Sequence, residues 1–392
     1  MPSPFVDERD SLSGRVRSAV VLLALAFVAG CNPSPEADEK PASATAGDAV
    51  TAESSADTSV TPATLTEAYE TPRTPSDNID SPALWHGDNG EHWILATAKE
   101  GDAVVVYDAT SGETVRRVGR EGTGAAQFDR PNGIVVHGDM AYVIERNNHR
   151  IHALRLPSLE SAGWFGSDVL RRPYGGTVVP DTGNAFSLYV TDNYETEDEQ
   201  IPADSLLDER VKQFRVTVSP DTVQGSLVRS FGDTTGAGVL RKVETIWADP
   251  QNERLLIAEE DELVHKIYTL DGTFTGKMVG QGQFQYEPEG LVLYACDDGS
   301  GYWVATDQDE QVNQFRVFDR TSFEPVGSFS GKITSNTDGV ALSQRSFGDF
   351  GSGAFIAVHD DQSVSAFQWS DIAGALNLRE TCTTESTMAA SG

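Results

Sequence analysis

A pattern of short apolar segments that recurs six times restricts the fold of this chain more than any other feature. From about residue 77 onward these segments are separated by turns rich in Gly, Asp and Asn, which is typical of β-strands and not of amphipathic helices. Each copy begins with an apolar strand, continues with a second strand that in most copies ends in acidic or amide residues, and adds a third and usually a fourth strand. The first segments of the six copies lie at 83–85, 133–135, 176–178, 245–247, 290–292 and 339–341.

The copies are roughly 43 to 69 residues apart, at or above the spacing of four-stranded propeller blades. We therefore predict an all-β fold, a six-bladed β-propeller over residues 67–378 with four-stranded antiparallel blades around a central channel. One copy, at 122–154, resembles an NHL repeat, which is itself a propeller blade. Because the last blade must be joined to the first, we expect residues around 65–69 to add an outer strand to the C-terminal blade. The long third copy contains an acidic insertion at 195–209, which we interpret as a surface loop.

Residues 1–30 have the features of a bacterial lipoprotein signal peptide. Basic residues precede an apolar run, 19–28, that is too short to span a bilayer, and small residues lead directly to Cys31. This cysteine resembles the one that bacteria acylate, which predicts a lipid anchor and a location in the cell envelope, and Asn32 after it favours the outer membrane. An ordinary signal peptide with an incidental cysteine is the alternative. Residues 31–66 hold almost no large apolar side chains, so we expect a disordered tether.

The formal net charge of −31 narrows the possible ligands. Such a charge repels nucleic acid, anionic lipid and bare polyphosphate, so an anionic ligand would need a cation to bridge it. We expect no nucleic-acid partner, membrane contact through the N-terminal lipid only, and a monomer.

The three cysteines include no C-x-x-C pair, which argues against thiol redox chemistry and structural zinc. Cys296 ends the first strand of the fifth copy, and Cys382 lies in the C-terminal tail, residues 379–392. In an oxidising compartment a disulfide between them would fix the tail to the propeller. Two free thiols are the alternative.

Two repeat positions should converge on the channel mouth, because the first strand of each propeller blade starts, and the second ends, at the same rim. The first position holds Asp80, Asn132, Tyr174, Glu244, Glu289 and Asp338. The second position holds Lys99, Glu145, Arg146, Asp192, Asn193, Glu259, Glu260, Asp261, Asp307, Asp309, Asp360 and Asp361. So many carboxylates would repel one another without cations between them, and Ca²⁺, which takes oxygen ligands in flexible geometry, fits best. The alternative is that they are ordinary turn-forming acids.

Lys99, Arg146 and Tyr174 lie among these acids at the same predicted rim. Basic groups within a ring of carboxylates indicate an anionic substrate that is held by metal and side-chain cations together. The alternative is that Lys99 and Arg146 only pair with neighbouring acids.

Several stretches around these positions share one pattern: Leu-Leu-Ile-Ala-Glu-Glu-Asp-Glu at 255–262, Glu-Pro-Glu-Gly-Leu at 287–291, Gly-Tyr-Trp-Val-Ala-Thr-Asp-Gln at 301–308 and Thr-Asp-Gly-Val at 337–340. Together they resemble the alkaline β-propeller phytases. Asn-Ile-Asp-Ser-Pro-Ala-Leu-Trp at 78–85 is similar to the N-terminal Asp-Asp-Pro-Ala-Ile-Trp motif of that family, and Lys-Val-Glu at 242–244 is similar to its fourth-blade acidic position. The similarity extends over roughly residues 77 to 372.

The resemblance implies a calcium-dependent phosphatase that hydrolyses myo-inositol hexakisphosphate (phytate), as its calcium complex, through a metal-activated water. By the same resemblance, the metal ligands would be Asp80, Glu244, Glu260, Glu289 and Asp338. The rim position adds Glu259 to these candidates. Lys99, Arg146 and Tyr174 would contact phosphate, and with Glu244 they are the candidate catalytic residues. The sequence has no Gly-x-Ser-x-Gly elbow and no P-loop, which agrees with a reaction that needs no side-chain nucleophile.

Three positions depart from the family pattern, and each change removes charge from the metal or phosphate site. Ser81 stands where the family has a second acid, Glu100 where it has a second basic residue, and Asn193 where it has a lysine. These losses and the NHL-like copy leave a second function open, a non-catalytic, calcium-stabilised envelope propeller that binds protein or glycan through its rim. A lactonase-type hydrolase on a calcium propeller is a further alternative.

Overall fold

The computed structural model describes residues 62–181, 185–220 and 222–382. The predicted signal peptide, the lipidation site Cys31 and most of the predicted tether lie outside these residues. Within them, no helix is both long and apolar enough to cross a bilayer.

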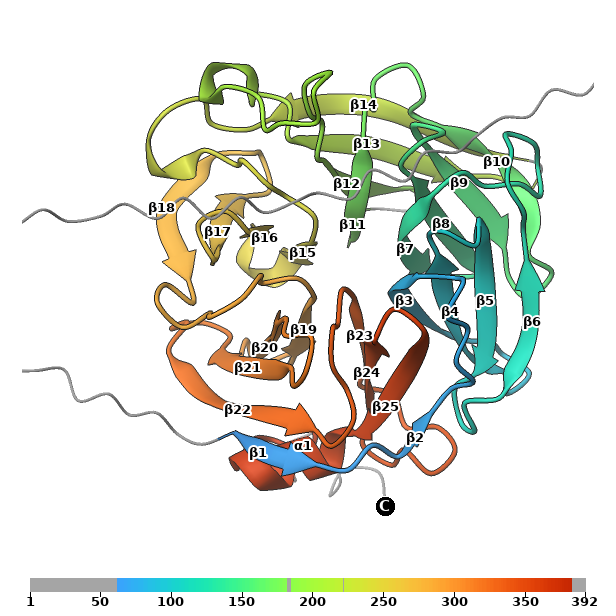
Figure 1. Ribbon diagram of the computed structural model, residues 1–392, viewed down its shortest axis with the longest axis vertical. Coiled ribbons are helices and arrows are strands. Elements are labelled where there is room, and N and C mark those ends of the chain that lie inside the picture. Colours follow the sequence, from blue (N-terminus) through green and yellow to red (C-terminus); the bar gives the residue numbers. More distant parts are fainter. Residues whose placement is uncertain (1–61, 182–184, 221, 383–392) are drawn as a thin grey trace, which may run out of the picture. The chain divides into compact units, whose positions relative to one another are not determined.

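Six sheets, each built on four antiparallel strands, form a ring around a central channel, so the predicted six-bladed β-propeller is confirmed (Figure 1). The first two blades consist of β3 (Ile79–His86), β4 (His92–Ala98), β5 (Ala103–Asp108) and β6 (Thr114–Val118), then β7 (Pro131–His137), β8 (Met140–Glu145), β9 (Arg150–Arg155) and β10 (Glu160–Phe165). The third and fourth consist of β11 (Pro173–Pro180), β12 (Ala185–Asp192), β13 (Val211–Val218) and β14 (Val223–Phe231), then β15 (Ile246–Asp249), β16 (Arg254–Glu259), β17 (Val264–Thr269) and β18 (Phe274–Val279). The fifth contains β19 (Leu291–Ala295), β20 (Gly301–Asp307), β21 (Gln314–Asp319) and β22 (Pro325–Gly331), and the sixth β23 (Val340–Ser343), β24 (Ala354–His359) and β25 (Ser363–Gln368).

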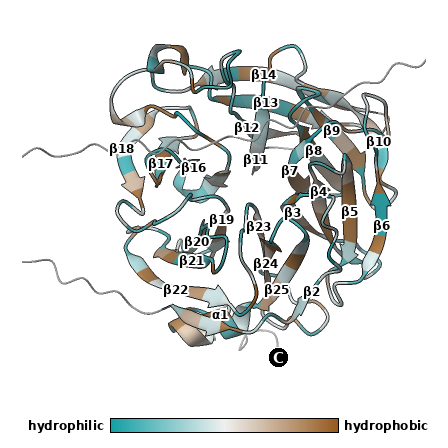
Figure 2. Cartoon of the chain, in the orientation of Figure 1, coloured by the Kyte–Doolittle hydropathy of each residue, from teal (hydrophilic) through white to brown (hydrophobic). Residues whose placement is uncertain are grey.

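The hydrophobic core lies between the blades, because each sheet packs its apolar side chains against the next sheet. Between the first two blades, for example, Trp85, Leu95, Ile134 and Val143 belong to one buried cluster. The second strands are the most deeply buried, and every residue of β8 and β24 is inaccessible to solvent or nearly so. Figure 2 shows the same distribution, with hydrophobic residues in the strands and hydrophilic ones mostly in the loops.

Strands from the N-terminal side close the ring. β2 (Tyr69–Glu70) pairs with β25 and supplies the fourth strand of the sixth blade, as the sequence predicts for this region. β1 (Ala63–Leu65) adds a fifth, parallel strand to the fifth blade, next to β22. Between them, Glu67 accepts hydrogen bonds from two backbone N–H groups after β22, both at 3.0 Å. The ordered fold therefore begins before the predicted tether boundary at Thr66.

A short helix, α1 (Trp369–Leu376), follows the sixth blade and was not expected from the sequence. Trp369 and Ile372 are buried, and the Trp369 ring stacks on Tyr294 with 4.2 Å between centroids. The chain then reaches Cys382, which forms a disulfide with Cys296. The tail is thereby joined to the fifth blade. Three further helical turns of the 3-10 type, η1 (Asp204–Leu206), η2 (Gly236–Gly238) and η3 (Pro250–Asn252), lie in loops.

Candidate functional site

Glycines in the first strands bring neighbouring blades together at the channel mouth. A Cβ atom on Gly133 would lie 2.2 Å from the carbonyl oxygen of Tyr174, and one on Gly175 would lie 2.3 Å from that of Glu244. The blades can approach this closely only without a side chain at these positions. The residue before each glycine is thereby brought close to its counterpart in the next blade, which is why the first repeat position converges as predicted.

On one side of the mouth, Lys99 lies between two carboxylates. Its Nζ is 2.7 Å from Asp80 Oδ2 and 3.0 Å from Asp338 Oδ2. Burial lowers the pKa of Lys99, but the two carboxylates outweigh this effect and raise the pKa well above its usual range. The Tyr174 hydroxyl donates to Asp80 Oδ2 at 3.1 Å. Burial and the neighbouring carboxylates raise the pKa of Tyr174, so it remains a protonated hydroxyl that can donate a hydrogen bond.

On the other side, Glu244, Glu260 and Glu289 form a cluster in which one carboxylate oxygen of each lies within 4.8 Å of the others. It is the one such group of three or more potential metal ligands among the described residues. Burial is the largest cause that raises the pKa of all three, and repulsion within the cluster adds to it for Glu260 and Glu289. Lys242 Nζ lies 2.6 Å from Glu260 Oε2 and 2.9 Å from Glu287 Oε1.

The donor set of this cluster fits a hard cation such as Ca²⁺. All the ligand atoms offered are carboxylate oxygens, which Ca²⁺ prefers. Glu260 is 3% exposed, and although Lys242 lies nearby, neither of its carboxylate oxygens has a well-oriented hydrogen bond. A buried carboxylate without hydrogen bonds costs free energy unless a cation compensates for it. Asp80 and Asp338 belong to the same mouth but are already neutralised in part by Lys99.

Glu259, predicted as a metal ligand, lies outside this cluster. Its Oε1 accepts hydrogen bonds from the backbone N–H groups of Arg241 and Lys242, at 3.2 and 3.1 Å, and its Oε2 accepts one from Glu262 at 3.1 Å. Lys266 Nζ is 3.6 Å from the same Oε2. The carboxylate therefore joins the loop before β15 to β17, and its oxygens have little capacity left for a metal.

The equivalent acids of the second, third and fifth blades have the same structural role; they are Glu145, Asp192 and Asp307. Each accepts a backbone N–H from the loop before the first strand of its own blade, and each lies near a basic side chain of the third strand. The residue directly after this acid is the one at the mouth. In the second to fifth blades that residue is Arg146, Asn193, Glu260 and Gln308, and in the first blade, where Ala98 takes the place of the acid, it is Lys99.

Arg146 forms an ion pair with Glu195, whose Oε2 lies 3.6 Å from Arg146 Nη2. Arg172 pairs with the same oxygen of Glu195. Arg172 and Lys242 are two basic residues of the site that sequence reasoning did not select. The available signal is their spacing, because each lies in the loop before a first strand, two residues before a residue of the first repeat position.

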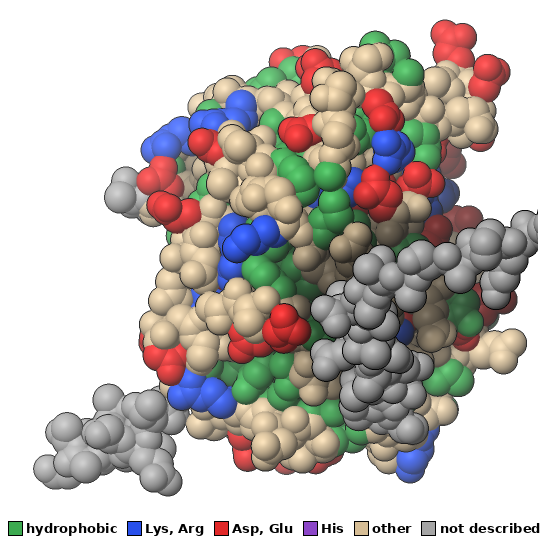
Figure 3. Space-filling model, turned by 90° about the vertical axis from the view of Figure 1, so that its left-hand side faces the viewer, with side chains coloured by type: hydrophobic (Ala, Val, Ile, Leu, Met, Phe, Trp, Pro, Cys, Tyr) green, Lys and Arg blue, Asp and Glu red, His purple; other side chains and the backbone are tan. Residues whose placement is uncertain are grey.

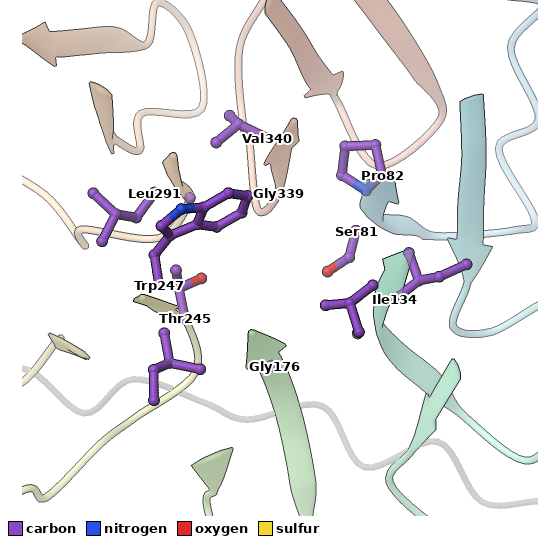
Figure 4. Close-up of a pocket in the computed structure, with 14 residues that line it drawn as sticks. Ser81, Pro82, Ile134, Gly176, Thr245, Trp247, Leu291, Gly339 and Val340 are labelled. Carbon is purple, nitrogen blue, oxygen red and sulfur yellow. The ribbon is translucent and has the colours of Figure 1, made fainter. Parts of the chain in front are cut away.

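The mouth continues into the channel, which is lined by first-strand residues of all six blades. Figure 4 shows Trp247 and Leu291 on one side and Ser81, Pro82 and Ile134 on the other. The lining is mostly apolar or glycine, so the charged groups are confined to the mouth. Away from the mouth, Figure 3 shows acidic and basic side chains interspersed over one side of the propeller.

Fold and site together define the class of this protein as a six-bladed β-propeller whose channel mouth carries a buried carboxylate cluster with lysines beside it. The family model described as Phytase matches residues 212–372. The matched part includes Glu244, Glu260, Glu289 and Asp338. The predicted resemblance to the β-propeller phytases is thereby confirmed over these residues, and it supports a hydrolase.

Two solved structures are similar to this chain. One is a structure of streptogramin B lyase, with 11% identity and a TM-score of 0.45, which covers 76% of this chain and 96% of that chain. The other is the hydrazine synthase of Kuenenia stuttgartiensis, with 12% identity and a TM-score of 0.46, which covers 81% of this chain and 83% of that chain.

Proposed function

We propose that this protein is a calcium-dependent phosphomonoester hydrolase of the 3-phytase type that acts on myo-inositol hexakisphosphate. The observation that carries the proposal is the cluster of Glu244, Glu260 and Glu289, whose carboxylate oxygens lie close to one another. Within it, neither oxygen of the buried Glu260 has a well-oriented hydrogen bond. The Phytase family match over this part of the chain supports the same reaction.

Each residue at the mouth has a role that follows from its contacts. Glu244, Glu260 and Glu289 would hold calcium, and Asp80 and Asp338 lie next to them at the same mouth. Calcium, when bound there, would neutralise the carboxylates and the substrate phosphates and would activate water for attack on phosphorus. Lys99 offers a cation and Tyr174 a hydroxyl to the phosphate, because both already contact the oxygen of an anion, Asp80.

The departures from the family motifs affect charge more than geometry. The Ser81 hydroxyl donates a hydrogen bond to Asp80 Oδ1 at 2.9 Å, at the position of the missing second acid. Asn193 Nδ2 lies 3.5 Å from Glu244 Oε1, at the position of the missing lysine. Both side chains therefore still orient a carboxylate of the mouth.

The experiment that tests the proposal is phosphate release from calcium phytate by the purified protein, across a calcium titration with an EDTA control. We expect release that rises with calcium and disappears in EDTA, and loss of release in Glu244→Gln. The matched control is Glu253→Gln, which makes the same change at an exposed turn at the other end of β16. No release at any calcium concentration, with calcium-dependent thermal stabilisation only, would instead indicate the non-catalytic propeller.

A further inference from the structure

Two arginines beside the carboxylate cluster share a single acidic partner. Glu195 Oε2 pairs with Arg172 Nη1 and lies 3.6 Å from Arg146 Nη2. Arg146 comes from the second blade and Arg172 from the loop before β11 of the third, so the pair spans a boundary between blades. Two guanidinium groups directed at one oxygen form a strong site for an oxyanion, because each offers planar, charge-assisted hydrogen bonds.

The charge at this place is not balanced. The two arginines carry two positive charges, while Glu195 contributes one negative charge, and the other acidic contact, from Glu199 to Arg172, is 3.6 Å long with the Glu199 side chain 75% exposed. A phosphate group carries more negative charge than a carboxylate and has more acceptor oxygens. It is therefore a better partner for this arginine pair than the carboxylate that occupies it.

Glu195 is held in place from its N-terminal side. The ring of the preceding Tyr194 contacts two guanidinium groups, that of Arg171 at 3.5 Å and that of Arg210 at 4.5 Å from its centroid. The Tyr194 hydroxyl donates to the carbonyl oxygen of Leu206 at 2.6 Å. The start of the acidic insertion is thus anchored, while the Glu195 side chain itself is 24% exposed and can rotate towards solvent.

The pair is also well placed for a second phosphate of a substrate bound at the mouth. Asn193, which contacts Glu244 of the cluster, has its backbone N–H bonded to the carbonyl oxygen of Arg172 at 2.9 Å. Tyr174, which donates to Asp80, lies two residues after Arg172. The positive charge that Asn193 does not provide is therefore present one strand away, on Arg172.

We propose that Arg146 and Arg172 form an anion subsite for a phosphate group of the substrate, and that Glu195 occupies this subsite until the phosphate displaces it. The inference rests on the proposed function, which supplies a polyphosphorylated substrate at this mouth. It assigns Arg172 as a substrate-binding residue and Glu195 as a residue that sets affinity for anions.

Binding of a non-hydrolysable polyanion tests the subsite without reference to catalysis. The probe is myo-inositol hexasulfate, titrated by calorimetry into the full protein at a fixed calcium concentration. Glu195→Gln should bind it roughly five-fold more tightly than the unmodified protein, the equivalent of about 1 kcal/mol for a displaced, partly exposed ion pair. Arg172→Gln should bind it more weakly, and Glu195→Gln should give no gain in the Arg172→Gln background.

The matched control is Glu209→Gln, because Glu209 lies at the other end of the insertion and also pairs with an arginine, Arg171, at 2.5 Å. It removes the same charge without touching the subsite, so its affinity for the probe should stay unchanged. An equal gain in both variants, a gain that persists without Arg172, or no binding by any of the proteins would overturn the subsite. Tighter binding by Glu195→Gln together with no phosphate release from phytate would instead retain the subsite and reject the hydrolase.

Discussion

The same substitution, Glu to Gln, should change the stability of the calcium-free protein in opposite directions at the neighbouring residues Glu259 and Glu260. In Glu259→Gln, the amide that replaces one carboxylate oxygen cannot accept the hydrogen bonds that the oxygen accepts from backbone N–H groups. The substitution also removes the negative charge that pairs with the buried Lys266. In Glu260→Gln, the same change removes a negative charge from a cluster of three carboxylates.

The magnitudes follow from these contacts. Each buried donor left without an acceptor costs about 1 to 3 kcal/mol, so Glu259→Gln should lower the free energy of unfolding by about 2 to 4 kcal/mol. Burial raises the pKa of Glu259, because it disfavours the ionised carboxylate. This cost of burial offsets part of the benefit of the hydrogen bonds, so the expected loss of stability is smaller than the summed costs of the individual donors. Two unit charges within 4.8 Å repel by about 3.5 kcal/mol or more at an effective dielectric constant of 20. Lys242 offsets part of this repulsion, so Glu260→Gln should stabilise the calcium-free protein by about 1 to 2 kcal/mol.

The assay is chemical unfolding of both variants in EDTA and again in calcium. In EDTA the midpoint should fall for Glu259→Gln and rise for Glu260→Gln. In calcium the unmodified protein should gain stability by mass action, Glu259→Gln should gain a similar amount, and Glu260→Gln should gain much less. Two variants that both lose stability in EDTA would refute the assignment of Glu260 to a repulsive metal cluster, and equal calcium stabilisation in both would refute the separation of their roles.

Three further predictions concern the scaffold. Burial raises the pKa of Asp249, but hydrogen bonds and charge from Arg320 and its neighbours outweigh this effect and lower the pKa. The ionised Asp249 therefore contributes stability above the unfolded pKa of about 3.9, and this contribution is lost as pH falls through the lower folded pKa. Asp249→Asn should accordingly flatten the acid side of a curve of stability against pH. Removal of the disulfide by Cys296→Ser should cost about 2 to 5 kcal/mol, and an unchanged unfolding midpoint would show that the bond does not constrain the tail. Gly175→Ala should lower stability by about 1 to 3 kcal/mol and should also reduce the stabilisation by calcium, because the new Cβ would meet a carbonyl of the next blade. Gly351→Ala is the control and should change neither quantity, because the space around Gly351 is open.

The fold could be predicted from the sequence because a propeller is periodic. Each blade repeats the same order of apolar strands and polar turns, so six weak signals reinforce one another, and the closing strand near Tyr69 could be expected from the need to complete the sixth blade. α1 was missed because it is one eight-residue element without a repeat, and its buried face depends on contacts with β1, β22 and β25.

The acids of the site could be located from the sequence but not sorted by role. Glu259 and Glu260 are adjacent, have the same chemistry and lie at the same repeat position. Only the direction of each side chain separates them, since one turns to the backbone of the preceding loop and the other to the channel mouth. The same holds for Lys242 and Arg172, whose relation to the mouth depends on how the loops before the first strands are placed.

The sequence by itself determined the number of blades and the end of the channel at which acidic residues gather, because these depend on period and composition. The tertiary structure decided which carboxylates face one another, which are already saturated by backbone N–H groups, and that Glu195 meets Arg146 and Arg172. These contacts join residues from different blades and loops, and their energies depend on distances of a few ångströms that no local pattern encodes.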